Sequence, residues 1–150
     1  NVGGIVSASA SASSGLPITF SSLTPSICSV STNRVTGLLA GTCSIAANQA
    51  GNTTFSSAAQ VNQSFAVTKL SQTLVLTVPA SITRPATGTV SASASSGLAV
   101  MLSSSTPSIC SISGNKVTGK AAGICTISAV QAGNSMYNAT GPISKNITTK

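Results

Sequence analysis

The sequence predicts an all-β protein that contains two copies of a small two-sheet sandwich. Apolar residues recur at every second position, which is the period of a strand, and no stretch has the period of a helix. Turn-forming Gly, Pro, Ser, Thr and Asn interrupt the chain at short intervals. The segment from Thr24 to Asn52, TPSICSVSTNRVTGLLAGTCSIAANQAGN, returns from Thr106 to Asn134 as TPSICSISGNKVTGKAAGICTISAVQAGN.

The repeat has the length of a whole domain. Cys110 follows Cys28, and Cys125 follows Cys43, by 82 residues (110 − 28 and 125 − 43), so nothing is inserted between these landmarks. A period that long, containing about seven short strands, matches a two-sheet sandwich better than a solenoid of shorter repeats. We therefore predict one domain over residues 1–68 and a second over residues 69–150.

The first predicted strand runs from Gly4 to Ser14, where alanine alternates with serine in GIVSASASASS. Its counterpart, Gly88 to Ser96, alternates in the same phase. Small side chains on the inward face let the facing sheet approach closely. After turns at Gly15 and Gly97, the next strands contribute the inward pairs Ile18 and Phe20, and Val100 and Leu102.

Each copy of the motif places two cysteines on the inward face of its strands. Cys28 points inward from one short strand, and after two turns Cys43 points inward from another. The second copy places Cys110 and Cys125 in the same way. After the motif, a Gly-Asn turn precedes an aromatic residue that we expect to close one end of the core. These aromatic residues are Phe55 and Tyr137, and the closing strands follow near residues 61–67 and 143–149.

The segment between the two copies, Leu70 to Val78, reads LSQTLVLTV and predicts the opening strand of the second domain. The counterpart of this strand would precede Asn1. We therefore expect the first domain to lack its opening strand and to leave a sheet edge open. A neighbouring repeat, or a neighbouring subunit in a fibre, could donate the strand that this edge lacks.

The four cysteines predict two disulfides, Cys28–Cys43 and Cys110–Cys125. The members of each pair lie 15 residues apart and share the inward phase. Zinc sites built on cysteine usually contain a CxxC pair, which is absent here, and free buried thiols are the other alternative. Because disulfides persist in oxidising compartments, we expect an exported protein.

The chain contains no Asp, no Glu and no His. General acid–base catalysis needs a group that titrates near the working pH, and a Ser or Thr nucleophile needs a base to activate it. Calcium sites need carboxylate oxygens, and Lys–Asn isopeptide cross-links resemble reactions assisted by a buried carboxyl group. The composition therefore predicts a protein that is not an enzyme, with no catalytic, cofactor-binding or metal-binding residues.

The cations are dispersed along the chain and give a formal net charge of +7. Dispersed charge favours solubility and permits weak contact with anionic glycans or surfaces. No basic run supports specific nucleic-acid binding, and no apolar run approaches the roughly 20 residues of a membrane span. The chain begins without Met or a signal peptide, so we interpret it as a processed or excised fragment. The cations are Arg34, Lys69, Arg84, Lys116, Lys120, Lys145 and Lys150.

A glycan-binding module is an alternative function. Such modules usually rely on exposed aromatic residues and carboxylates, and this chain has no Trp and a single Tyr. Four Asn-x-Ser/Thr triplets fit the N-glycosylation pattern, but a chain rich in Asn, Ser and Thr contains such triplets by chance. The triplets begin at Asn52, Asn62, Asn138 and Asn146.

Part of the motif also follows a family pattern. The first copy contains Val35-Thr36-Gly37, Ala40-Gly41-Thr42 and Ile45, and the second contains Val117-Thr118-Gly119 and Ala122-Gly123. In these residues each copy resembles the bacterial immunoglobulin-like domains of group 2, which recur in invasin- and intimin-like surface proteins. The chain departs from the family in carrying cysteines at the two usual small core positions of each copy.

The resemblance implies two tandem immunoglobulin-like β-sandwich domains of a bacterial extracellular or cell-surface protein. Repeated domains of this family set length and stiffness, so the implied role is a stalk, spacer or filament subunit of an adhesin or surface fibre. The implied partners are neighbouring repeats of the same protein. An adhesive module that binds glycans or anionic surfaces is the alternative.

We predict that the free energy of unfolding stays nearly constant from about pH 3 to about pH 8. The slope of stability against pH is proportional to the difference in bound protons between the unfolded and folded states. Because Asp, Glu and His are absent, only the chain termini titrate in this range, and the slope is close to zero. Melting temperatures at about pH 3 and pH 7, at equal ionic strength, measure this. A drop of more than roughly 8 °C at the acid end would contradict it.

Overall fold

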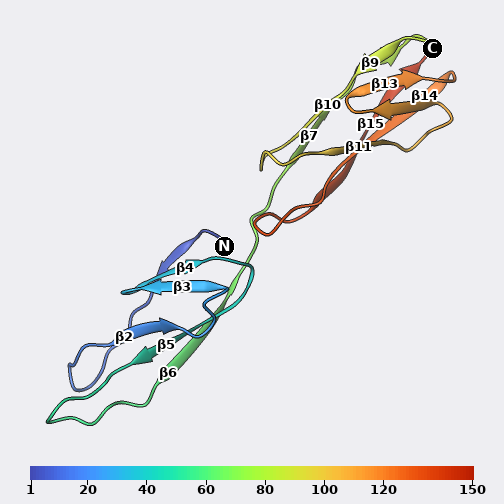
Figure 1. The fold of residues 1–150 in the computed structure, drawn as a ribbon. Helices are drawn as coiled ribbons and strands as arrows, with labels where there is room; N and C mark the ends of the chain where they lie inside the picture. Colours follow the sequence, from blue (N-terminus) through green and yellow to red (C-terminus); the bar gives the residue numbers. More distant parts are fainter. The chain divides into compact units, whose positions relative to one another are not determined.

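The computed structural model describes all residues from Asn1 to Lys150 and contains strands, turns and loops but no helix (Figure 1). The chain divides into unit 1, Asn1–Leu70, and unit 2, Ser71–Lys150. The sequence placed this division after residue 68, and the structure places it after residue 70. Each unit has its own sheets and its own hydrophobic core.

Unit 2 forms a four-stranded sheet in the order β11-β14-β15-β8, a three-stranded sheet β12-β13-β9 and the pair β10-β7. Neighbouring strands are antiparallel, except that β8 runs parallel to β15. The strands are β7 (Leu74–Thr77), β8 (Ser81–Ile82), β9 (Thr87–Thr89), β10 (Ser91–Ala94), β11 (Met101–Ser104), β12 (Cys110–Ser113), β13 (Lys116–Gly119), β14 (Gly123–Gln131) and β15 (Thr140–Thr149).

Unit 1 repeats part of this arrangement in two three-stranded antiparallel sheets, β1-β4-β3 and β2-β5-β6. The first corresponds to β9-β13-β12 and the second to β11-β14-β15, each 82 residues later. Unit 1 has no strand that corresponds to β7, β8 or β10. Its strands are β1 (Ile5–Ser7), β2 (Thr19–Ser22), β3 (Cys28–Ser31), β4 (Arg34–Gly37), β5 (Gly41–Asn48) and β6 (Val61–Val67).

The core of each unit consists of the inward side chains of its strands. The alternation of the sequence explains this, because successive side chains of a strand point to opposite faces. The core of unit 1 is the smaller. It consists of Val2, Cys28, Val35, Cys43 and Val67. The core of unit 2 consists of Leu76, Ile82, Val90, Cys110, Val117, Cys125, Ile127, Ala129 and Ile147.

The alternating segment from Gly4 to Ser14, predicted as one strand, forms a strand only over β1. Its counterpart in unit 2 divides at the buried Val90 between two sheets, since β9 pairs with β13 and β10 pairs with β7. Unit 1 has no equivalent of β7 to pair with the residues that correspond to β10. Alternation alone therefore does not make a strand here, because a strand also needs a partner for its backbone groups.

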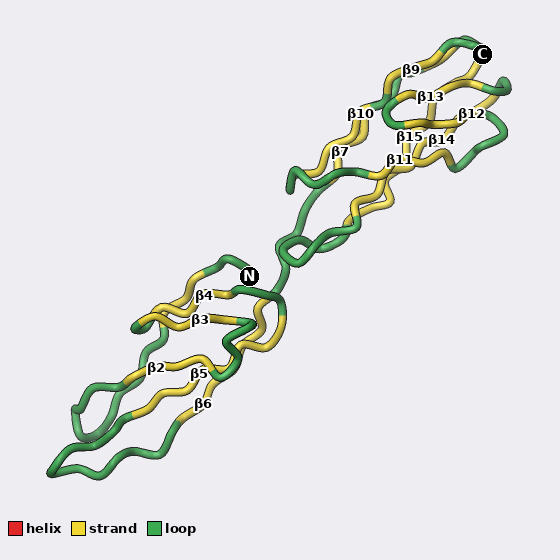
Figure 2. Tube along the Cα trace, viewed as in Figure 1, coloured by secondary structure: helices red, strands yellow, loops and turns green.

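Loops follow β5 and β14 (Figure 2), and each of them contains a glycine turn. Gly51 and Gly133 adopt φ angles of 74° and 73°, a region that favours glycine. A Cβ atom at either position would lie 2.5 Å from the carbonyl oxygen of the following aromatic residue, Phe55 or Tyr137. The glycine of each Gly-Asn turn is therefore required for steric reasons in both units.

We predict that Ile127→Ala destabilises unit 2 more than Ile45→Ala destabilises unit 1. These residues are counterparts, but Ile127 is fully buried in a closed core and Ile45 lines an open groove. Truncating a buried isoleucine costs about 2–5 kcal/mol because it leaves a cavity, and truncation beside an open groove leaves no closed cavity. Native-state hydrogen exchange reports the unfolding free energy of each unit separately. Equal losses in the two variants would contradict the prediction.

Candidate functional site

Each unit contains one buried disulfide that joins two different sheets. Cys28 at the start of β3 is bonded to Cys43 of β5, and Cys110 at the start of β12 is bonded to Cys125 of β14. The Cα atoms of each pair are 5.6 Å apart, and all four side chains have no exposed surface. These are the pairs that the sequence predicts. Each disulfide is a covalent link across the core of its unit.

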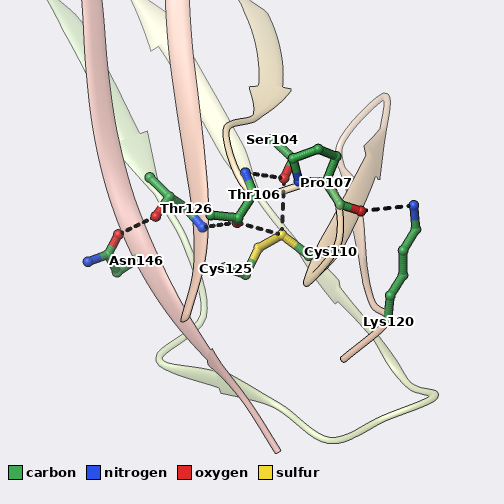
Figure 3. The surroundings of a disulfide bond; sticks show 8 residues. All are labelled: Ser104, Thr106, Pro107, Cys110, Lys120, Cys125, Thr126 and Asn146. Atoms are coloured by element: carbon green, nitrogen blue, oxygen red, sulfur yellow. Dashed lines mark hydrogen bonds between the residues drawn. A yellow bond between two sulfur atoms is a disulfide. The ribbon is translucent and has the colours of Figure 1, made fainter. Parts of the chain in front are cut away.

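Hydroxyl groups surround the disulfide of unit 2 (Figure 3). Ser104 Oγ lies 3.2 Å from Cys110 Sγ, and Thr106 Oγ1 lies 3.7 Å from the same sulfur. The Thr106 backbone N–H donates to Ser104 Oγ at 3.2 Å. The N–H of Thr126, the residue after Cys125, donates to Thr106 Oγ1 at 2.9 Å. The two hydroxyl side chains therefore connect the backbone around one cysteine to the strand that carries the other.

Unit 1 repeats this arrangement. Ser22 Oγ and Thr24 Oγ1 lie 3.5 and 3.6 Å from Cys28 Sγ. The N–H of Ser44 donates to Thr24 Oγ1 at 2.9 Å. The cysteine pairs were predicted from the sequence, but these hydroxyl partners were not. The available signal was the TPSIC sequence, which is identical in the two copies and places Thr24 four residues before Cys28.

The chemistry of these centres is that of structural cross-links. The thiolate is the form of cysteine that acts as a nucleophile or a metal ligand, and all four sulfurs are oxidised and buried. The side chains that hydrogen-bond to Cys28 and Cys110 carry neutral hydroxyls. No group of three or more His, Cys, Asp or Glu side chains is placed to hold a metal ion.

The cations make few contacts with the rest of the chain. Lys120 Nζ donates to the carbonyl oxygen of Pro107 at 3.2 Å (Figure 3), and Arg84 Nε donates to that of Lys150 at 3.3 Å. All of the cations are exposed except Lys69, which is half-buried. With no acidic side chain in the sequence, none of them forms an ion pair with another side chain.

Unit 1 also contains an open groove of about 770 Å³. One wall is the segment 6–14, and the sheet β2-β5-β6 contributes the opposite wall through residues that include Phe20, Ile45 and Phe65. Phe55 lines the groove and is 47 % exposed, so the prediction that this ring closes one end of the core is wrong. The ring does not close the core because the core beside it is open.

Strand β7 occupies the corresponding position in unit 2. It pairs with β10, and its Leu76 belongs to the same buried cluster as Ile127, Ala129 and Ile147. The residues 82 positions earlier than these three line the groove of unit 1. They are Ile45, Ala47 and Phe65. The groove is therefore the place that β7 fills in unit 2.

A buried amide network holds the start of this strand in unit 2. Gln72 Nε2 donates to Gln131 Oε1 and to the Asn138 carbonyl oxygen, and Ser96 Oγ donates to Gln72 Oε1. Both glutamines are less than a tenth exposed. This network was not predicted from the sequence. Its signal was Gln72 at a position that alternates in phase with the inward leucines, where a polar residue needs a buried partner.

A scan against protein-family models and a search of curated proteins each found no match. The structure has no helix of the length and apolarity that crossing a membrane requires. The fold and the site thus define the class directly, as an all-β protein made of two repeated units with one cross-sheet disulfide each.

We predict that replacing Cys28 and Cys43 together by alanine destabilises unit 1 by about 3 kcal/mol, the chain-entropy value for closing a loop of 15 residues. Hydrogen exchange should show the loss in unit 1 and leave unit 2 unchanged. The matched variant, with alanine at Cys110 and Cys125, should lose stability in unit 2 and leave unit 1 unchanged.

Intact mass provides the direct measurement of the cross-links. The unreduced protein should weigh four hydrogens less than its sequence, because each disulfide removes two. The folded protein should also contain no thiol that reacts with an alkylating reagent. Detection of four such thiols without reduction would contradict both disulfides.

Proposed function

We propose that this chain is a non-catalytic structural segment of a bacterial extracellular repeat protein, in which two immunoglobulin-like sandwich domains act as a stalk, spacer or filament subunit. The duplication of a whole unit carries this proposal. The two copies keep an 82-residue offset and repeat the same disulfide with the same hydroxyl partners. A repeated unit with its own core adds length without needing a ligand.

The arrangement of sheets and disulfides supports the immunoglobulin-like part of the proposal. In each unit, a disulfide joins a strand of one antiparallel sheet to a strand of the other, as in the sandwich of antibody domains. The disulfides also support an extracellular location, because such bonds persist in oxidising compartments.

The types of side chain in the chain support a structural role rather than catalysis. The disulfide centres offer no free thiolate, and the sequence offers no Asp, Glu or His to activate one of its many hydroxyls. The alternative function, an adhesive module for glycans or anionic surfaces, is supported by the exposed cations, which are not neutralised by any acidic side chain.

Pulling the single molecule by its ends tests the structural role. We expect two unfolding events in the oxidised chain, one for each unit. Reduction should lengthen each event by about 50 Å, because it releases a 15-residue loop at about 3.4 Å per residue. A chain that extends without a force peak would contradict the spacer role.

Binding to heparin distinguishes the spacer role from the adhesive alternative. A spacer should not bind immobilised heparin saturably near physiological ionic strength, where exposed charges are screened beyond about 8 Å. Saturable binding that is lost in the variant with Lys116→Gln and Lys120→Gln would favour the adhesive module instead.

A further inference from the structure

We infer that a pair of hydroxyl side chains sets the direction of thiol–disulfide exchange at each disulfide. Cys28 and Cys110 are the sulfurs that attack as thiolates when the bond forms and that leave as thiolates when it is reduced. Cys43 and Cys125 are the sulfurs that carry the mixed disulfide with the reacting thiol. This order of exchange depends on the disulfide centres alone and is independent of the proposed structural role.

The hydroxyls beside Cys110 are oriented as donors to its sulfur. A disulfide sulfur carries no hydrogen, so the O–H groups of Ser104 and Thr106, at 3.2 and 3.7 Å, can only donate to it. Ser104 Oγ accepts the N–H of Thr106, and Thr106 Oγ1 accepts that of Thr126. Each oxygen therefore has an N–H directed at it, which leaves its own hydrogen free to point at the sulfur.

This arrangement is one-sided and occurs in both units. In unit 1, Ser22 Oγ and Thr24 Oγ1 lie beside Cys28 Sγ, and each of these oxygens accepts a backbone N–H in the same way. Every hydrogen bond to a sulfur atom in the chain ends at Cys28 or Cys110. The two sulfurs of each disulfide therefore differ in their surroundings, and the difference is the same in the two units.

The donors favour the thiolate form of the cysteine that they contact. Sulfur in a neutral cysteine or disulfide is a weak acceptor, and hydrogen bonds to an ionised acceptor are about twice as strong. Hydrogen bonding to the charged form of a group lowers its pKa. Because a thiol of lower pKa leaves faster in exchange, cleavage should release Cys110 and place the attacking thiol on Cys125.

A local turn keeps the donors beside Cys110. All four sulfurs are fully buried, so a thiol reaches them only after local opening of the unit. Ser104 and Thr106 lie within six residues of Cys110, and the carbonyl oxygen of Thr106 accepts the N–H of Ile109 at 2.9 Å and that of Cys110 at 3.0 Å. Cys125 is on a different strand, β14. The hydroxyls therefore remain with Cys110 when β14 moves away.

Reduction of the bond has two steps. A low-molecular-weight thiolate attacks Cys125 Sγ and forms a new S–S bond with it, while Cys110 Sγ takes the electron pair of the old bond and leaves as a thiolate. A second thiolate then attacks the sulfur of the bound thiol, and Cys125 leaves. The protein disulfide gains two electrons, two thiols become one disulfide, and their two protons pass through water to the released cysteines. Formation of the bond reverses these steps, with a low-molecular-weight disulfide as the oxidant.

A neighbouring charge does not explain the asymmetry. Lys120, the charged side chain drawn beside the disulfide of unit 2, donates to the carbonyl oxygen of Pro107 (Figure 3). The counterpart of Lys120 in unit 1 is the uncharged Leu38. The chain also has no acidic side chain and no histidine. The hydroxyl pair is therefore the feature that the two centres share.

Mapping of mixed disulfides in the intact chain tests the assignment. The oxidised protein is treated with reduced glutathione, quenched early with N-ethylmaleimide, which blocks the released cysteine, and cleaved by trypsin after Lys120, between Cys110 and Cys125. We expect glutathione on Cys125 at least about fivefold more often than on Cys110, and the corresponding preference in unit 1. Glutathione shared evenly between the two cysteines, or found mainly on Cys110, would overturn the assignment.

Two alanine variants separate the effect of the hydroxyl from the accessibility of each sulfur. Ser104→Ala removes the closer donor, so the preference in unit 2 should fall by at least about twofold while that in unit 1 stays unchanged. Ser103→Ala is the matched control, because it removes an exposed hydroxyl of the same strand that makes no bond to sulfur. An unchanged preference in Ser104→Ala, or an equal change in Ser103→Ala, would contradict a role for the hydroxyl.

Thiolate absorbance provides a measurement that needs no access to the sulfurs. Cys125→Ala leaves Cys110 as the one free thiol, and Cys110→Ala leaves Cys125, since unit 1 keeps its disulfide. We expect a lower pKa for Cys110 than for Cys125, and adding Ser104→Ala to Cys125→Ala should raise the pKa of Cys110. Equal pKa values, or a lower one for Cys125, would overturn the assignment. If either variant unfolds, the map of mixed disulfides in the intact chain decides.

Discussion

The disulfide between the two sheets is the interaction on which each unit depends. The chain has only four aromatic residues, so its cores are built from Val, Ile, Leu and Ala, which bury modest areas. A unit of this size is near the lower limit at which one hydrophobic core suffices. A bond between Cys28 and Cys43 constrains the unfolded chain and holds the sheets together where larger side chains would otherwise do so. The flanking hydroxyls hold the backbone at the same point.

The all-β fold class, the repeat and the cysteine pairs could be predicted from the sequence, because each depends on local periodicity and spacing. Residues that alternate in phase share a face, so Cys110 and Cys125 could be placed inside before any fold was known. The hydroxyl partners could not be placed in this way. Thr106 contacts the sulfur and the strand of Thr126 because the turn before β12 folds back on itself, and that geometry depends on tertiary packing.

Two of the wrong predictions depend on whether a strand has a partner. The Ala-Ser alternation of residues 8–12 resembles that of β10, yet only β10 has a neighbour and becomes a strand. Phe55 is exposed for the same reason, because the core beside it is open. Gln72 lies in phase with the inward leucines, but the sequence alone identifies no buried partner for it. Its burial becomes clear only when Gln131 and Ser96 are placed around it.

The composition also limits how an open edge can be protected. Natural sheet edges usually avoid unwanted pairing by carrying charged residues, proline or a covering segment. The segment 6–14 of unit 1 has no charge and no proline, and no acidic residue exists anywhere in the chain. In unit 2, a covering strand with inward leucines and one buried glutamine closes the same surface. The two units therefore share one sequence pattern, but the sheet edge is open in unit 1 and is covered by β7 in unit 2.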